Sequence, residues 1–295
     1  MALSKAPTVA HVRVDEGSAG QRIDNFLVRV CKGVPKSHIY RILRSGEVRV
    51  NSKRVAQTYR LQEGDELRIP PIRLAEKPDA PPVPVGKPFD IVFEDDALLV
   101  LDKPAGLAVH GGSGVSFGVI EQLRRQRPEA KFLELVHRLD RETSGLLIVA
   151  KKRSALTVLH DMMREGRVHK RYLTLVAGRW LNLQQHIKLA LHKYLTEAGE
   201  RRVSVSRDGK PAHSIVRLVK RWQRCSLVEV ELKTGRTHQI RVHLSHSGFP
   251  LFGDDKYGDF ALNKQLEKAG LKRMFLHAAK LDRKSTRLNS SHESP

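Results

Sequence analysis

The sequence predicts an α+β protein of two domains, and three observations carry that prediction. Strand-like and helix-like apolar patterns follow one another irregularly, without the strand–helix–strand alternation of a doubly wound sheet. Seven of the 14 prolines lie between residues 70 and 88, which is typical of a stiff, extended linker. The 295 residues are enough for two hydrophobic cores. We therefore expect a small N-terminal α/β domain over 20–70, a Pro-rich linker over 71–88 and a larger domain over 89–282.

The N-terminal region predicts two helices and two strands. Residues 1–19 show only a short apolar–polar alternation and are interpreted as an arm or an edge strand. Two short helices with apolar stripes follow, and Ser37 is the predicted N-cap of the second, which Gly46 ends. Alternating segments at 48–50 and 67–69 then predict strands. The outward face of the second helix is basic.

The larger domain begins with two apolar strands at 90–93 and 98–101, separated by an acidic turn. The sequence Lys-Pro-Ala-Gly at 103–106 then forces a bend. Apolar residues at helical spacing predict a helix that ends near Pro128. Further strands are expected at 146–150, 214–219 and 227–232, and further helices with N-caps at Ser154 and Thr237.

The chain is strongly basic, with a formal net charge of +21 and a pI near 10.3. So large an excess indicates a polyanionic partner. Nucleic acid is favoured over an acidic membrane surface, because no apolar run is long enough to span a bilayer and the first residues lack a secretory signal. Cys31 and Cys225 do not have the spacing of a disulfide framework or a cysteine metal site. We therefore expect a reducing, cytoplasmic compartment.

The stretch 135–145 places polar residues on a turn between an apolar segment and a strand. Asp140 is the candidate catalytic carboxylate, because Arg138 and Arg141 flank it and nearby cations keep a carboxylate ionised and nucleophilic. Spacing alone leaves a surface turn with an ordinary ion pair equally open.

Three stretches, His137–Gly145, Lys170–Val176 and Thr234–Leu244, resemble the signature motifs of the RluA-type pseudouridine synthases in the family's order. The resemblance implies a catalytic domain with a mixed, mostly antiparallel central sheet. It also implies isomerisation of uridine in RNA without a metal, a redox cofactor or ATP. Gly20–Leu27 similarly resembles the S4-type RNA-binding module, so the basic face of the second predicted helix is expected to contact phosphates.

The resemblance assigns roles to individual residues. Asp140 would be the nucleophile, Tyr172 the aromatic ring that stacks on the target base, and Arg241 the cation paired with Asp140. Arg138 would fill the space that the extruded uridine leaves. Further RNA contacts are predicted at Lys36, Arg41, Arg44, Lys170, Arg236 and His238. A metal site shared by the histidines near His243 is disfavoured, because helical spacing makes them diverge, and they are expected to hydrogen-bond loops.

Several alternatives stay open at this point. A glycosidase would need a second, acid-acting carboxylate, which no motif supplies. A serine hydrolase using His137, Asp140 and Ser144 would lack the G-x-S-x-G turn. Transfer RNA is the alternative to large-subunit ribosomal RNA as substrate, and a catalytically inactive S4-type RNA-binding or ribosome assembly factor is the alternative from another class. The expected partner is large-subunit ribosomal RNA or a pre-ribosomal particle, acted on by a monomer, with no membrane and no nucleotide cofactor.

The C-terminus departs from the family pattern. Residues 283–295 are polar and hydroxyl-rich and have no apolar period. They are interpreted as a non-native or disordered tail, which would leave the catalytic domain over 89–282 incomplete at its C-terminal end.

Overall fold

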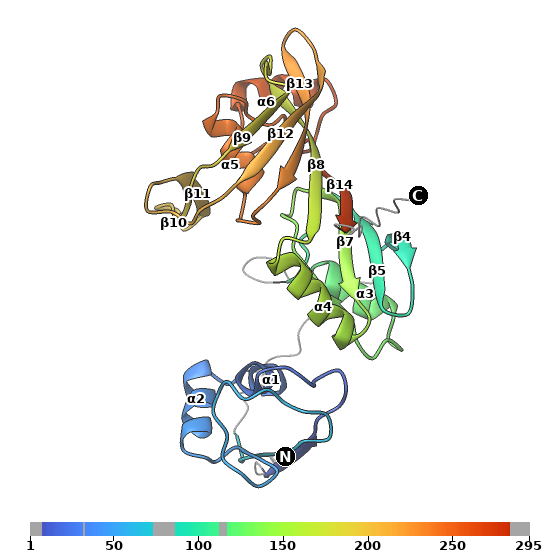
Figure 1. The fold of residues 1–295 in the computed structure, drawn as a ribbon, viewed down its shortest axis with the longest axis vertical. Helices are drawn as coiled ribbons and strands as arrows, with labels where there is room; N and C mark the ends of the chain where they lie inside the picture. Colours follow the sequence, from blue (N-terminus) through green and yellow to red (C-terminus); the bar gives the residue numbers. More distant parts are fainter. Residues whose placement is uncertain (1–7, 32, 73–85, 112–116, 284–295) are drawn as a thin grey trace, which may run out of the picture. The chain divides into compact units, whose positions relative to one another are not determined.

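The computed structural model describes residues 8–31, 33–72, 86–111 and 117–283 (Figure 1). The chain divides into two compact units, 1–84 and 85–295, and the division falls inside the predicted linker. Most of that linker, and the predicted tail beyond Arg283, lie outside the described residues. Of the helices that the structure describes, none has the length and apolar content needed to cross a membrane.

The N-terminal unit packs two helices on a three-stranded antiparallel sheet. Its elements are β1 (Ala10–Arg13), α1 (Ile23–Val30), α2 (Lys36–Arg44), β2 (Arg49–Val50) and β3 (Glu66–Ile69), with the strands in the order β1-β3-β2. Residues 1–19 therefore contribute an edge strand, and Ile23, Leu27 and Leu67 form part of one buried core. The predicted N-cap at Ser37 is wrong, because Pro35, with φ −58° and ψ 141°, holds the N-cap position and α2 has already begun at Lys36.

The second unit is built on a nine-stranded sheet. From one edge to the other run β4 (Asp90–Glu94), β5 (Leu98–Lys103), β7 (Ser144–Ala150), β14 (Leu276–Arg283), β8 (Val168–Ala177), β13 (Cys225–Leu232), β12 (Ser214–Arg221) and β9 (Gln184–Ile187), and β6 (Glu134–Leu135) pairs with β7. A separate hairpin is formed by β10 (Leu191–Leu195) and β11 (Arg201–Val205). The helices are α3 (Val119–Gln126), α4 (Arg153–Arg164), α5 (Gln239–His246) and α6 (Phe260–Lys268). Among the described residues only β7 and β14 pair in parallel, so the predicted mixed, mostly antiparallel sheet is confirmed.

The centre of this sheet is the junction of β7, β14 and β8 (Figure 1). Gly145 has φ +109°, and a Cβ atom there would lie 2.4 Å from the carbonyl oxygen of Ala278. Only glycine therefore lets β14 approach β7 at this point. Leu147 and Val149, which follow on β7, are fully buried in the main core. The sheet centre thus anchors the chain directly after the stretch 135–145.

Two predicted helix starts are displaced by local backbone geometry. Lys152, with φ −133° and ψ 147°, is the N-cap of α4 in place of Ser154. His238 is the N-cap of α5 in place of Thr237, because its left-handed backbone (φ 54°, ψ 20°) turns the chain sharply before Gln239. This left-handed residue turns out to lie in the site described next.

Candidate active site

Asp140 lies on the loop between β6 and β7, and this loop is held by hydrogen bonds from both sides. The backbone N–H of Val136 donates to Ile148 O (3.0 Å), and that of Thr143 donates to Asp140 O (3.1 Å). His137 Nε2 accepts from the N–H of Ile148 at 3.1 Å. Burial lowers the pKa of His137 to about 4, so the ring stays neutral and keeps this acceptor. The carboxylate of Asp140 is therefore presented from a rigid loop.

A buried lysine fixes the other side of the loop. The Lys103 ammonium, fully buried, donates to Pro104 O (2.8 Å), Leu107 O (2.8 Å) and Arg141 O (3.0 Å). The N–H of Gly106 donates to the same Arg141 oxygen at 2.9 Å. Burial lowers the pKa of Lys103 to about 8, although nearby carboxylates oppose this shift. The sequence had indicated only a bend here, yet the lysine ties the first strands of the domain to the loop that carries Asp140.

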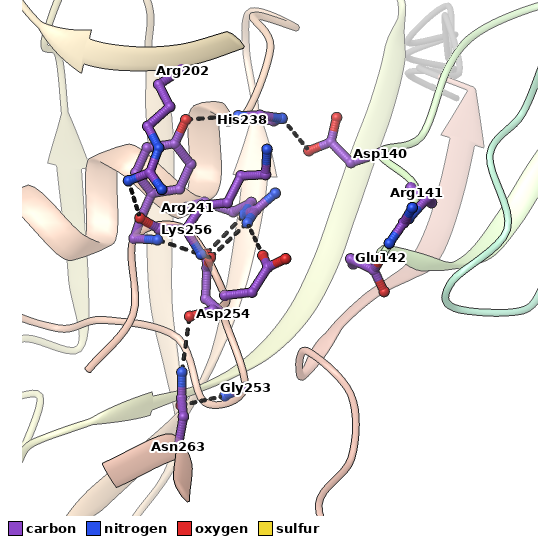
Figure 2. A network of polar contacts seen from close by, with 12 residues as sticks. Asp140, Arg141, Glu142, Arg202, His238, Arg241, Gly253, Asp254, Lys256 and Asn263 are labelled. Atoms are coloured by element: carbon purple, nitrogen blue, oxygen red, sulfur yellow. Dashed lines mark hydrogen bonds and ion pairs between the residues drawn. The ribbon is translucent and has the colours of Figure 1, made fainter. Parts of the chain in front are cut away.

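The Asp140 carboxylate faces His238, whereas the flanking Arg141 pairs elsewhere. Oδ2 of Asp140 lies 4.0 Å from Nε2 of His238 (Figure 2). Arg141 Nε donates to Glu142 Oε1 at 2.7 Å, and the side chains of this pair are 61% and 24% exposed. Both open interpretations of the stretch thus apply to different residues: an ordinary surface ion pair for Arg141, and a pocket carboxylate for Asp140.

Arg241 is buried in the site, at 2% exposure. Its Nε and Nη2 donate to Asp254 at 2.8 and 2.6 Å, and Nη2 also donates to Asp255 at 3.1 Å (Figure 2). The direct pair that the sequence predicts between Arg241 and Asp140 is not among the contacts of the described residues. Burial lowers the pKa of Arg241, but the hydrogen bonds to Asp254 and the charges of Asp254, Asp140 and Asp255 outweigh it and raise the pKa. Asp140 and Arg241 are therefore electrostatic neighbours without a direct bond.

The buried Asp254 holds this arginine and is itself held from several directions. It accepts from the backbone N–H groups of Lys256 (2.9 Å) and Tyr257 (3.0 Å). Burial raises its pKa, but Arg241 and these backbone donors overcome that effect and leave the pKa lowered. Asn263 of α6 donates to Asp254 O at 2.8 Å (Figure 2). The Arg241 guanidinium is thus oriented by a turn that a hydrogen bond from α6 stabilises.

His238 completes the contact between Asp140 and the rest of the site. Its Nδ1 lies 2.7 Å from the Tyr257 hydroxyl, which also accepts from the N–H of Val203 at 2.9 Å. In the tautomer whose Nδ1 accepts from this hydroxyl, the Nε2–H faces Asp140. Burial lowers the pKa of His238, although Asp140 opposes this. A neutral imidazole therefore lies against the carboxylate.

Tyr172 comes from β8, between β14 and β13, and is 7% exposed. Burial, and after it the charge of Asp140, raises the pKa of the phenol. The ring therefore stays neutral at physiological pH. It is positioned by the sheet itself, whereas Asp140 is positioned by a loop.

Two adjoining cavities meet at Asp140. The smaller, about 320 Å³, contains both Asp140 and Tyr172, and the larger, about 1130 Å³, extends from Asp140 to the β10–β11 hairpin. The predicted residues of the second unit all line the smaller cavity: Arg138, Asp140, Lys170, Tyr172, Arg236, His238 and Arg241. The predicted phosphate contacts Lys36, Arg41 and Arg44 are exposed on α2 of the N-terminal unit.

The hairpin brings further cations to the larger cavity. Lys193, Arg201 and Arg202 line it. Glu200 of the same hairpin bonds to Arg202 and to Lys256, which hold its pKa down to about 2. The hairpin is thereby tied to the turn that follows Asp254.

The sequence did not predict several residues that hold or line the site. They are Lys103, Asp254, Tyr257 and the hairpin cations. The run Gly253–Gly258 encloses Asp254 and Tyr257 between glycines, and that composition was the one available signal. Gly253 has φ +72°, and a Cβ atom there would lie 2.3 Å from Arg273 O.

The other chemistries considered from the sequence are not assembled here. Ser144 Oγ lies 3.0 Å from His277 Nδ1 and accepts from Arg273 at 2.9 Å, while His137 Nε2 is engaged by Ile148. A Ser144–His137–Asp140 triad is therefore absent. His243 Nε2 lies 3.0 Å from Leu189 O in the loop between β9 and β10, and His238 Nδ1 lies 2.7 Å from the hydroxyl of Tyr257 in the turn before α6, so the expectation that these two histidines hydrogen-bond loops is confirmed. His243 Nδ1 also lies 3.0 Å from Ser214 Oγ of β12. Within the described ranges no three His, Cys, Asp or Glu side chains are grouped to hold a metal ion.

Comparison with known proteins places this geometry in context. Residues 97–246 match the model of the RNA pseudouridylate synthase family, and residues 21–67 match the S4 domain. Ribosomal large subunit pseudouridine synthase C of Salmonella typhi and that of Escherichia coli K12 are each 53% identical to the chain over 285 residues, covering 94% of this chain and 89% of theirs. Among solved structures, human RNA Pseudouridylate Synthase Domain Containing 1 aligns with a TM-score of 0.57 and 28% identity, over 68% of this chain and 80% of that one.

Proposed function

Because the chain belongs to the RNA pseudouridylate synthase family, we propose that it isomerises specific uridines of large-subunit ribosomal RNA, with Asp140 as the nucleophile. The substrate is the one named for its 53% identical relatives. The observation that carries the assignment of Asp140 is its position where the two cavities meet, in the same cavity as Tyr172 and Arg241. The proposal includes a monomeric enzyme in the cytoplasm that acts on ribosomal RNA or on a pre-ribosomal particle.

The reaction is a rearrangement within one nucleoside. The bond between N1 of uracil and C1′ of the sugar breaks, the base turns, and C5 bonds to C1′. The proton lost from C5 is balanced by one gained at N1, so the product is an isomer of the substrate. Electron and atom counts close without an oxidant, a reductant or ATP.

Asp140 must stay ionised when RNA excludes water from the cavity. The Arg241 guanidinium, which Asp254 holds in place, is a fixed positive charge near that carboxylate. The neutral His238 Nε2–H at 4.0 Å offers a hydrogen-bond donor without competing for the proton.

Tyr172 gives the extruded uracil an aromatic surface. Taking a base out of its stack costs a few kcal/mol, and stacking on an aromatic side chain returns about 1–3 kcal/mol. Its raised pKa keeps the phenol protonated, so the hydroxyl can donate a hydrogen bond within the cavity. Arg138, exposed on the loop before Asp140, is assigned to the gap left in the RNA.

The test is the substitution Asp140→Asn. The amide keeps the shape of the carboxyl group but is not a nucleophile, so we expect pseudouridine formation to fall by about three orders of magnitude or more. The affinity for RNA should stay within about threefold, because the phosphate contacts are untouched. Carbodiimide and primer-extension mapping of ribosomal and transfer RNA measures the first quantity, and filter binding measures the second.

Three results would contradict the proposal. Undiminished pseudouridine formation by the Asn variant would remove Asp140 from the chemistry. Product found only in transfer RNA would overturn the substrate. RNA binding without any pseudouridine from the unmodified chain would indicate a binding factor rather than an enzyme.

A further inference from the structure

A second basic surface lies at the end of β12 and β13 that is remote from the cavities. We call it the distal patch, and its residues are all exposed: Arg179, Leu181, Leu183, Lys220, Trp222 and Arg224. In Figure 1 the connection between β12 and β13 stands at the upper end of the sheet, away from the β10–β11 hairpin. The function proposed above makes no use of these residues.

The patch is built from two segments that backbone contacts hold together. The N–H of Gly178 donates to Arg224 O at 2.9 Å, and that of Leu218 donates to Leu183 O at 3.0 Å. Arg221 donates from Nε to Trp180 O (2.6 Å) and from Nη2 to Leu181 O (2.9 Å). The segment 178–183 is thereby fixed beside the turn between β12 and β13, so the patch is a preformed surface.

Its surface combines apolar area with positive charge. Leu181 is 68% exposed, Leu183 79% and Trp222 41%, which is unusual for side chains of this size in one place. The Lys220 ammonium lies 5.2 Å from the centre of the Trp222 ring. Neither 177–184 nor 217–226 contains an Asp or Glu residue. The patch therefore offers an aromatic face and several cations without a neutralising acid.

The patch is too far from Asp140 to contact the target nucleotide. Ser214, at the opposite end of β12, accepts from Gln239 of α5 at 2.9 Å, next to His238 of the site. Arg221 lies seven residues further along β12. At about 3.3 Å per residue that is roughly 23 Å. A ligand that reaches both places must be a macromolecule.

We propose that the distal patch is a second RNA-binding surface, on which an unpaired base stacks on Trp222 while Lys220, Arg179 and Arg224 contact the adjoining phosphates. The inference rests on the proposed function, because a large RNA held at Asp140 is what brings a second segment within reach. The pairing of an exposed aromatic ring with cations is the chemistry that binds single-stranded nucleic acid. The absence of acidic residues from both segments favours a polyanion over a protein with a mixed surface.

Tryptophan fluorescence tests the inference directly, because the chain has two tryptophans and Trp180 is only 1% exposed. The probe is an in vitro transcript of the large-subunit ribosomal RNA domain that contains the modified uridine. Its addition to the full chain should quench the Trp222 signal, and the quench should vanish in Trp222→Phe. Unchanged fluorescence at saturating RNA would overturn the inference.

Substitutions measure how much the patch contributes. Trp222→Ala should weaken binding of the transcript about 5- to 100-fold, whereas Trp222→Phe should stay within about threefold. The matched control is Phe260→Ala, which removes an exposed aromatic ring from α6 and should change nothing. The double variant Lys220→Ala, Arg224→Ala should lower the slope of log K against log salt by about 1.4. The control double variant Lys264→Ala, Lys268→Ala, on α6, should leave that slope unchanged.

A short substrate separates this inference from the proposed function. On a stem–loop of about 20 nucleotides around the modified uridine, Trp222→Ala should match the unmodified chain in kcat and KM, because such an RNA supplies no second segment. On the long transcript it should raise KM without lowering kcat. Equal affinity of Trp222→Ala and the unmodified chain for the transcript would overturn the patch while leaving the enzyme intact. If Trp222→Ala and the unmodified chain sedimented differently in the absence of RNA, the patch would be assigned to self-association instead.

Discussion

Arginine is placed in opposite ways on α2 of the N-terminal unit and in the candidate active site of the second unit. On α2 of the N-terminal unit, Arg41 and Arg44 are exposed, and neither pairs with a carboxylate of the described residues. In the second unit Arg241 is buried and donates three hydrogen bonds, two to Asp254 and one to Asp255. Exposed cations supply salt-dependent affinity for any phosphate backbone. A buried, oriented guanidinium supplies a fixed charge at one point.

The same residue type is therefore exposed in one unit, where we propose that it adds affinity for RNA, and buried in the other, where its partners fix its position. A buried charge must be compensated, so its partners become structural requirements. An exposed charge needs no partner, so its loss leaves the fold intact. Substitutions of buried charges should therefore change the free energy of unfolding more than substitutions of exposed charges. The following four are ordered by the size of the change that we expect.

Asp254→Asn should have the largest effect. The amide keeps the size of the carboxylate but removes the only buried carboxylate that the described residues place against Arg241 and leaves the exposed Asp255 as its carboxylate partner, so the free energy of unfolding should fall by about 3–5 kcal/mol. Urea unfolding followed by tryptophan fluorescence measures the free energy of unfolding of the second unit, because both tryptophans belong to it.

The matched control for that variant is Asp255→Asn. Asp255 contacts the same guanidinium but its side chain is 61% exposed, so the cost should stay below about 1 kcal/mol. Equal losses for the two variants would show that burial does not decide the outcome, and the comparison would fail.

Lys103→Met should come next and has a pH signature. The pKa of Lys103 falls from 10.5 to about 8 on folding, so the unfolded chain binds more protons than the folded one between pH 8 and 10.5. Stability contributed by this group therefore rises with pH in that window. The difference in unfolding free energy between the unmodified chain and Lys103→Met should grow by about 2 kcal/mol from pH 8 to pH 10. A difference that is flat across this window would mean that Lys103 is not desolvated as described.

These buried groups also mark the limit of what the sequence could predict. The loop of Asp140 was recognisable because its flanking strands and polar residues are adjacent in the chain. The pairing of Arg241 with Asp254 was not recognisable, because a carboxylate 13 residues away produces no periodic pattern. Judged by charge alone, Asp140 is an equally good partner for Arg241. Lys103 was missed for a similar reason: three backbone carbonyls hold it, and carbonyls leave no trace in a sequence.

The fold divides in the same way. Strands such as β5, β12 and β13 alternate or are continuously apolar, and their positions were predicted. The short strands β9 to β11 and the central strand β14 were not predicted. The position of β14 in the sheet depends on a close contact between Gly145 and Ala278, which are more than a hundred residues apart in the chain. A local sequence pattern cannot predict such a contact.

Replacement of Lys36, Arg41 and Arg44 by alanine should leave stability almost unchanged. Their side chains are exposed on α2, and alanine favours helix, so the unfolding free energy should change by less than about 1 kcal/mol. The affinity for RNA should fall, and the slope of log K against log salt should drop by about 2–3. Thermal unfolding together with a salt titration of RNA binding checks both. An unchanged salt slope would remove α2 from the RNA interface, and a large loss of stability would contradict the role given to exposed charges.

Glu142→Gln should have the smallest effect, although Glu142 lies two residues from Asp140. Its partner Arg141 is 61% exposed, and ion pairs at the surface contribute about 0–1 kcal/mol. Its charge does help to keep Lys103 protonated, so a small decrease in the pKa of that lysine should accompany an otherwise unchanged fold and pseudouridine yield. Urea unfolding at pH 7 and at pH 9 would detect the shift as a slightly larger rise in the free energy of unfolding between the two pH values than the unmodified chain shows. If Glu142→Gln instead abolished activity while the fold persisted, nearness to Asp140 in the sequence would outweigh burial, and the distinction between exposed and buried charges would not extend to the loop that carries the nucleophile.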